Sequence, residues 1–159
     1  KVLSELKDTG IIFTYPNSDT DGRQIIQMID SFVLEHENAI AFINLGQLKY
    51  FSCIQFIDGV IGNSSSGLIE IPTFRKGTIN IGDRQKGRIQ AGSVIQCEPT
   101  YDSIKNAVTK LYSESFQSSL SQVENPYGDG GATEKTMNIL KNISMSNIVK
   151  KQFYDLNIK

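Results

Sequence analysis

Short apolar runs alternate with longer amphipathic stretches along most of this chain. The first apolar run, from Ile11 to Tyr15, predicts a buried strand that stops at Pro16. The next stretch carries apolar residues at helical spacing from Ile25 to Val33 and predicts an amphipathic helix. The alternation then continues. We expect further strands at 39–43, 58–61, 78–81 and 94–96, and further helices after Gly46, after Gly67, across 104–111 and across 132–143.

Strands that alternate with helices over 159 residues predict one α/β domain built on a parallel, doubly wound sheet. This length is typical of a single domain and is enough to bury a sizeable core. In such sheets, ligands bind outside the carboxyl ends of the strands. The rule points to four segments of this chain, at 16–22, 44–47, 62–67 and 82–88.

Charge and cysteine usage narrow the classes of partner. The formal net charge is −1, so no strong field attracts nucleic acid, and the apolar stretches are too short to cross a membrane. Cys53 and Cys97 lie far apart, which suits reduced thiols in a cytoplasmic protein better than a disulfide framework. The single histidine excludes a His-rich metal site, and we expect neither a metal nor a cofactor.

The segment Gly62 to Gly67 lies where the third predicted strand gives way to a helix. Backbone N–H groups at a helix start lack partners and face a positive dipole, so a phosphate fits there. Ser64, Ser65 and Ser66 add hydroxyl donors, and Gly67 lets a ligand approach the backbone closely. Plain N-capping by serine is the alternative. The segment is neither a P-loop nor a Gly-x-Gly-x-x-Gly fingerprint, so both interpretations stay open.

Charged and polar residues near the same strand ends are candidates for contacts with the rest of a nucleotide. Glu70 follows one turn into the helix and could accept hydrogen bonds from two ribose hydroxyls, or merely complement the helix dipole. Arg84 follows the fourth strand, where a guanidinium suits a diphosphate. Asn17 follows the first strand and could also contact the nucleotide. Lys86 and Arg88 stay open between phosphate contact and a solvated charged loop.

Two other features are interpreted without a catalytic role. His36 closes a helix between two glutamates and is interpreted as a surface residue. The serine-rich stretch 113–121 is interpreted as an exposed helix end or loop. A carboxylate-rich acid/base site of the kind that glycosyl chemistry needs is not apparent, so we assign no catalytic residue in this chain.

Five motifs occur in a fixed order between about Ile11 and about Leu140. They are Thr14-Tyr15-Pro16-Asn17-Ser18-Asp19-Thr20-Asp21-Gly22, Leu45-Gly46-Gln47-Leu48, Gly62-Asn63-Ser64-Ser65-Ser66-Gly67-Leu68-Ile69-Glu70, Ile79-Asn80-Ile81-Gly82-Asp83-Arg84-Gln85-Lys86-Gly87-Arg88 and Asn125-Pro126-Tyr127-Gly128-Asp129-Gly130. Together they resemble the hydrolysing UDP-N-acetylglucosamine 2-epimerases of the sialic and legionaminic acid pathways. The resemblance implies the Rossmann-like C-terminal half of a glycosyltransferase-B fold.

The resemblance also implies a reaction and a set of roles. The family removes UDP from its sugar by anti elimination and adds water to the glycal, which releases N-acetylmannosamine. A sister branch acts on UDP-diacetylbacillosamine, and the loop from Gly82 to Arg88 does not separate the branches. By resemblance, Ser64 and Ser65 would hold the diphosphate, with backbone support from Gly67. Glu70 would hold the ribose, and Arg84 would line the same nucleotide site. The uridine would lie near Asn17.

The resemblance covers only the second half of a two-domain family. The chain also begins at Lys1 without a Met. We therefore expect 1–159 to be the nucleotide-binding C-terminal domain, and an N-terminal domain that supplies the catalytic carboxylates to be its partner. Alone, this chain is expected to bind the UDP-sugar without turning it over, because cleft closure positions the reacting groups. A glycosyltransferase-B transferase with the same nucleotide half and a free-standing nucleotide-binding domain without catalysis are the alternatives. A homodimer of the parent stays open.

Two local expectations follow from the same resemblance. The segment 147–159, with Val149, Phe153 and Leu156, is expected to form a helix that packs on the other half and exposes apolar area here. Family members often have Pro at the position of Thr78, before the fourth strand, and we expect only a local loop difference from this substitution.

Overall fold

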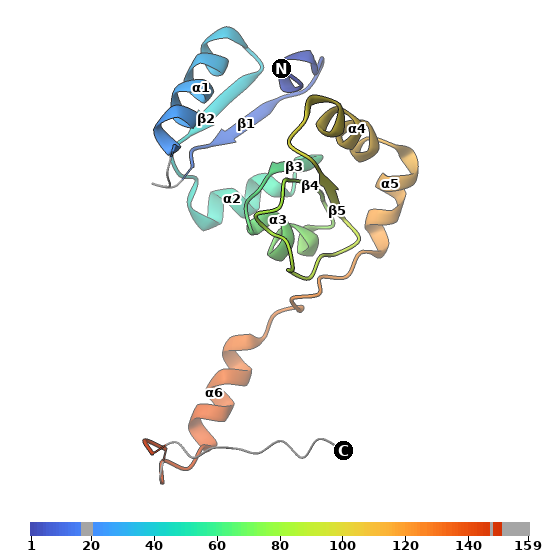
Figure 1. Ribbon diagram of the computed structural model, residues 1–159. Coiled ribbons are helices and arrows are strands. Elements are labelled where there is room, and N and C mark those ends of the chain that lie inside the picture. Colours follow the sequence, from blue (N-terminus) through green and yellow to red (C-terminus); the bar gives the residue numbers. More distant parts are fainter. Residues whose placement is uncertain (17–20, 147, 151–159) are drawn as a thin grey trace. The chain divides into compact units, whose positions relative to one another are not determined.

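The computed structural model describes residues 1–16, 21–146 and 148–150 (Figure 1). The chain divides into two compact units, Lys1–Tyr127 and Gly128–Lys159. The predicted α/β class is confirmed, because helices alternate with parallel strands in the first unit. Across the described ranges, no helix is long and apolar enough to cross a lipid bilayer.

The elements of the first unit follow the predicted order closely. Its strands are β1 (Ile11–Thr14), β2 (Ala39–Phe42), β3 (Gly59–Gly62), β4 (Gly77–Ile81) and β5 (Val94–Cys97). Its helices are α1 (Gly22–Glu35), α2 (Gly46–Ile54), α3 (Ser66–Ile69), α4 (Tyr101–Leu111) and α5 (Glu114–Ser119), with short 3-10 helices η1 (Leu3–Glu5), η2 (Ile71–Phe74) and η3 (Leu120–Gln122).

The strands form two parallel ladders rather than one continuous sheet. In the first ladder β1 pairs with β2, with Ile12 opposite Ile40. In the second, β4 lies between β3 and β5, with Ile79 opposite both Ile61 and Ile95. Joined between β1 and β3, the ladders would give the order 2-1-3-4-5 of a doubly wound sheet. In the described part of the chain, no ladder pairs β1 with β3.

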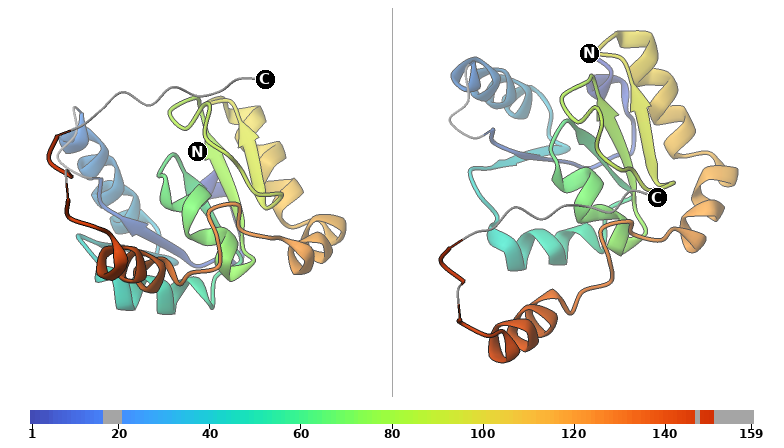
Figure 2. Two further views of the ribbon diagram at one scale, coloured as in Figure 1. Left: turned by 90° about the horizontal axis from the view of Figure 1, so that it is seen from below. Right: turned by 60° about the horizontal axis from the view of Figure 1, so that its bottom comes forward.

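Helices cover both faces of β4, and adjacent residues of the strand show it. A Cβ added to Gly77 would lie 2.3 Å from a methyl carbon of Leu111 in α4, so this residue faces α4. Thr78 contacts Gly67 of α3 on the opposite face. Successive strand residues point to opposite faces, so α4 and α3 sandwich the strand (Figures 1 and 2). The core on the α4 side comprises Ile79, Ile95, Cys97, Ala107, Leu111, Phe116 and Leu120.

The serine-rich stretch is a folded element, which corrects the expectation of an exposed helix end or loop. Ser113 is the N-cap of α5, and its hydroxyl accepts a hydrogen bond from the N–H of Phe116. Phe116 and Leu120 are buried in the core beside α4. The many serines obscured two apolar residues at helical spacing, whose burial fixes the segment.

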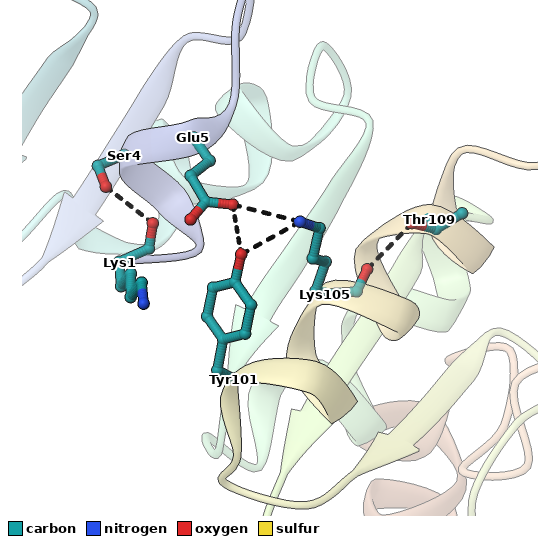
Figure 3. Close-up of polar contacts among 6 residues, drawn as sticks. All are labelled: Lys1, Ser4, Glu5, Tyr101, Lys105 and Thr109. Atoms are coloured by element: carbon teal, nitrogen blue, oxygen red, sulfur yellow. Dashed lines mark hydrogen bonds and ion pairs between the residues drawn. The ribbon is translucent and has the colours of Figure 1, made fainter.

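The segment ahead of β1 is tied to α4 by a small polar cluster (Figure 3). The Tyr101 hydroxyl donates to Glu5 Oε2 at 2.6 Å, and Lys105 Nζ lies 3.5 Å from the same oxygen. Lys105 Nζ also donates to the Tyr101 hydroxyl at 3.1 Å. The cluster therefore connects η1, which precedes the first ladder, with a helix that covers the second ladder.

The second unit contains α6 (Ala132–Asn142), which begins after Gly131 as the periodicity predicts. The expected terminal helix at 147–159 falls mostly outside the described residues, including Phe153 and Leu156. Val149, which is described, lies in a turn. Packing of this segment on another domain therefore stays a prediction.

Candidate functional site

The loops that follow β3 and β4 meet at Asn63. Its side-chain oxygen accepts a hydrogen bond from Arg84 Nη1 at 3.4 Å. Its backbone carbonyl accepts one from Gln85 Nε2 at 2.8 Å. Two of the four segments predicted from strand ends are thus brought together at neighbouring strands of one ladder.

A left-handed glycine turns the chain toward this meeting point. Gly82 follows β4 directly and has φ +74°, a conformation that glycine adopts without steric cost. Its N–H donates to the carbonyl of Cys97 at the end of β5, at 2.9 Å. The turn at Gly82 therefore fixes the direction in which the chain leaves the sheet, and it places Arg84 and Gln85 beside the loop after β3.

The serine loop keeps donors available at the end of β3. Helix α3 is only four residues long, and its N-cap residue Ser65 makes no side-chain capping bond. Ser64 Oγ accepts from the N–H of Ser66 at a long 3.4 Å. Among the described residues, the N–H groups of Ser64 and Ser65 find no acceptor. Strong N-capping by Ser65, the competing interpretation, does not occur, and so its hydroxyl is left for another contact.

Gly67 has a packing role that the sequence did not indicate. A Cβ at this position would lie 2.6 Å from Cγ2 of Thr78, so the bare backbone of α3 lies directly on β4. The Thr78 hydroxyl donates to the Gly67 carbonyl at 2.8 Å. Thr78 lies within β4 and is 2% exposed, which corrects the expectation of a local loop difference before the strand. The residue at this position shapes the contact between strand and helix.

Glu70 belongs to a chain of side-chain hydrogen bonds that ends on α2. Ser66 Oγ donates to Glu70 Oε2 at 2.5 Å, and the Tyr50 hydroxyl lies 2.6 Å from Ser66 Oγ. Burial raises the pKa of the Tyr50 phenol, and the nearby charge of Glu70 raises it further. The phenol therefore keeps its proton at neutral pH and is available as a donor.

The Asn-Pro-Tyr motif at 125–127 forms hydrogen bonds with both segments of the site, the one that follows β3 and the one that follows β4. Asn125 Nδ2 donates to the Ile69 carbonyl at 2.8 Å and to Thr73 Oγ1 at 2.7 Å. The Tyr127 hydroxyl donates to the Ile89 carbonyl at 3.0 Å. One end of the motif thus holds the α3–η2 turn, and the other end holds the loop that follows β4.

Five of the six predicted site residues lie in the two segments that meet at Asn63. Ser64 and Ser65 lie in the loop after β3, and Arg84 lies in the loop after β4. Glu70 directly follows α3, and Gly67 is buried within α3 against Thr78. Asn17, the sixth, lies outside the described residues. His36 stacks on Phe32 and bonds to its carbonyl at the end of α1, which supports the non-catalytic interpretation. Across the described parts of the chain, no group of three potential ligands is placed to hold a metal ion.

Sequence reasoning missed three residues that shape this site. Gln85 is 4% exposed although it lies in a charged loop, and Asn125 lies in a motif that the sequence treats only as a turn. Both lie inside the motifs that carry the family resemblance, and that was the signal available. Tyr50 has no such signal, because its contact depends on how α2 packs beside α3.

Comparison with known proteins relates the chain to sugar-nucleotide epimerases. The model of the UDP-N-acetylglucosamine 2-epimerase family matches residues 1–141. The GDP/UDP-N,N'-diacetylbacillosamine 2-epimerase (hydrolyzing) of Campylobacter jejuni is 38% identical over 98% of this chain and 41% of its own length. A UDP-N,N'-diacetylbacillosamine 2-epimerase (hydrolyzing) of Legionella pneumophila is 33% identical over 89% of this chain and 36% of its own length.

A relative named for the other sugar also aligns along almost the whole chain. The UDP-N-acetylglucosamine 2-epimerase of Neisseria meningitidis is 26% identical over 97% of this chain and 40% of its own length. The chain thus spans well under half the length of each of these curated relatives.

Proposed function

The chain belongs to the UDP-N-acetylglucosamine 2-epimerase family, and from this premise we propose that it is the nucleotide-binding part of a hydrolysing UDP-sugar 2-epimerase. One observation carries the proposal. The loops after β3 and β4 are joined at Asn63, so that Arg84 and the free donors of Ser64 and Ser65 belong to one edge of one sheet. This is the edge at which α/β sheets bind nucleotides.

Each residue of the site has a role that its chemistry suits. The N–H and hydroxyl donors of Ser64 and Ser65, with the guanidinium of Arg84, would hold the diphosphate. Glu70, as a carboxylate, would accept hydrogen bonds from the ribose hydroxyls. Asn17 would lie near the uridine.

The same contacts have a role in the reaction. As the bond between sugar and UDP breaks, negative charge grows on the diphosphate, and fixed donors at this site would stabilise it. The acid and base that act on the sugar would come from outside this chain. We therefore expect nucleotide binding by this chain and turnover only by a protein of the relatives' full length.

Titration of the chain with UDP, followed by amide NMR, tests the nucleotide site. We expect shifts concentrated at 62–70 and 82–88, larger with UDP than with GDP or inorganic phosphate at equal concentration. Glu70→Ala should weaken UDP binding by roughly tenfold, because one charge-assisted pair of hydrogen bonds is lost. No shift at millimolar UDP, or equal shifts with phosphate alone, would contradict the proposal.

Two sugars are candidates for the substrate. We propose UDP-N-acetylglucosamine, after the description of the matching family model, as the first. UDP-N,N'-diacetylbacillosamine is the second, and the two relatives at 38% and 33% identity that carry its name favour it. An assay of the complete reading frame with each compound separates them by which free 2-epimer accumulates beside UDP.

A further inference from the structure

The hydrogen bonds from α2 to Glu70 have a defined direction. A hydroxyl has one proton to donate, and Ser66 gives its proton to the Glu70 carboxylate, which can only accept. The bond between Tyr50 and Ser66 must therefore run from the tyrosine to the serine. Protons point along the chain from the phenol to the carboxylate, and each bond supports the next.

We call these two hydrogen bonds, from Tyr50 to Ser66 and from Ser66 to Glu70, the relay. The relay fixes one oxygen of Glu70 and leaves the other available. Ser66 binds Oε2, while Oε1 finds no partner among the described residues. A free glutamate side chain samples many rotamers, and ordering it when a ligand binds costs conformational entropy. A carboxylate that is already held in place does not incur this cost when a ligand binds.

The turn of α2 that carries Tyr50 is anchored on η2 by the neighbouring residue. Tyr50 is half-buried, and the ring of its neighbour Phe51 lies 5.5 Å from that of Phe74 in η2. The Ile69 carbonyl, next to Glu70, is held by Asn125. The relay therefore connects a fixed point on α2 with a fixed turn of the backbone, and Glu70 is the element between them.

We propose that Tyr50 is a positioning residue, which acts through Ser66 to hold Glu70 in the orientation that recognises a ribose diol. The inference rests on the proposed function. It adds a specificity: the chain distinguishes ribonucleoside from 2'-deoxyribonucleoside diphosphates, and the α2 hydroxyl sets how well it does so. Oε1 and the second lone pair of Oε2 can still accept the two ribose hydroxyls, and a fixed orientation helps most when both hydroxyls are present.

The test measures the affinities of UDP and 2'-deoxy-UDP for the 159-residue chain and its variants. We expect the wild-type chain to prefer UDP by roughly tenfold. Tyr50→Phe removes one hydroxyl and keeps the ring. It should weaken UDP binding by roughly three- to fivefold and 2'-deoxy-UDP binding by less than about twofold. The matched control is Tyr101→Phe, whose hydroxyl contacts Glu5 and Lys105, and it should leave both affinities unchanged.

A second variant tests the route through Ser66. Ser66→Ala should reduce the preference for UDP at least as much as Tyr50→Phe does. Adding Tyr50→Phe to Ser66→Ala should change nothing further, because the tyrosine then has no serine hydroxyl to act through. Ser66→Ala keeps the tyrosine intact, and so it carries the test if Tyr50→Phe fails to fold.

The outcomes separate this inference from the proposed function. Equal weakening of both nucleotides by Tyr50→Phe, or additive effects of the two substitutions, would overturn the relay. UDP binding that depends on Glu70 but keeps its full preference in Tyr50→Phe would overturn the relay alone. Absence of any UDP binding by the wild-type chain would remove the proposed function and this inference with it.

Discussion

The two ladders of the first unit differ in how their strands are covered. Four of the five residues of β4 are buried, so both faces of that strand are covered. In β1 and β2 the burial alternates: Phe13 packs edge-on against Phe32 of α1, while Ile12 and Ile40 on the other face are 45% and 49% exposed. Seven of the eight residues of β1 and β2 are apolar, yet these strands are covered on one face only, whereas β4 is covered on both.

The difference explains why the candidate site is built on the second ladder. Loops are positioned by the elements beneath them, and β3 and β4 are held by α3 on one face. On the other face α4 packs against β4 and β5. The contacts at Asn63 and the turn at Gly82 start from this fixed base. The loop after β1 begins from a ladder that is covered on one face only.

The largest contrast should appear when matched isoleucines are truncated. Ile79→Ala, in a side chain that is 1% exposed, should lower the free energy of unfolding by about 2–5 kcal/mol. Ile12→Ala, 45% exposed, should cost about 1 kcal/mol or less. Urea unfolding followed by circular dichroism measures both. Ile79→Val, expected to cost about 0.5–1.5 kcal/mol, provides a graded variant that folds. Equal losses at the two alanines would mean that the ladders are covered alike.

The contact between α3 and β4 offers a rescue experiment. Gly67→Ala forces a methyl group against Cγ2 of Thr78 and should destabilise the chain by about 1–3 kcal/mol. Thr78→Ser deletes that Cγ2 and keeps the hydroxyl that donates to Gly67. The double variant should therefore regain most of the lost stability. If Gly67→Ala is as destabilising in the Thr78→Ser background as in the wild-type chain, the crowding is not the cause.

Two asparagine side chains, one beside each ladder, allow a comparison of how much stability a hydrogen bond contributes in the two regions. Asn125→Ala removes two donated bonds that hold the α3–η2 turn, and should cost about 1–2 kcal/mol. Asn38→Ala removes one bond, to the Thr9 carbonyl beside the exposed ladder, and should cost about 0.5 kcal/mol or less. Amide hydrogen exchange should also quicken at 69–75 in the first variant only. A larger loss at position 38 would reverse the ranking of the two regions.

Much of the fold was predictable because apolar periodicity reports local structure. The runs at β1, β2 and β5 and the helical spacing in α1 and α4 all gave the right element. The same periodicity does not report how strands pair, so it could not indicate that the parallel strands pair in two ladders, β1-β2 and β3-β4-β5. The prediction of an exposed helix end or loop at 113–121 was also wrong, because the many serines drew attention away from the buried residues Phe116 and Leu120.

The site was predictable at the level of loops and not at the level of contacts. The strand-end rule points to the segments that contain Ser64 and Arg84, and Glu70 lies three residues beyond the first of them. The relay from Tyr50 was not predictable, because it depends on the packing of α2 against α3, sixteen residues later in the chain. The sequence gives no role to Gln85, and only its burial reveals its contact with the loop after β3.

The smallest expected effect concerns the polar cluster that ties the segment ahead of β1 to α4 (Figure 3). The hydrogen bond from Tyr101 and then the charge of Lys105 hold the pKa of Glu5 below its usual value of 4.5. A carboxyl group with a lowered folded pKa stabilises the fold above its unfolded pKa, and this contribution is lost as the pH falls through the folded value. Wild-type stability should therefore decline more steeply than that of Glu5→Gln below about pH 4.5.

The size of this effect is limited because the cluster is exposed to solvent and salt screens its charges. Tyr101→Phe keeps both charges and removes the largest cause of the lowered pKa, so its pH profile should lie between those of the wild type and Glu5→Gln. High salt should weaken the contribution of Lys105 and leave the hydrogen bond from Tyr101. Thermal unfolding of the three proteins across acidic pH measures the difference. Superimposable profiles would mean that the polar cluster between the segment ahead of β1 and α4 contributes nothing to stability.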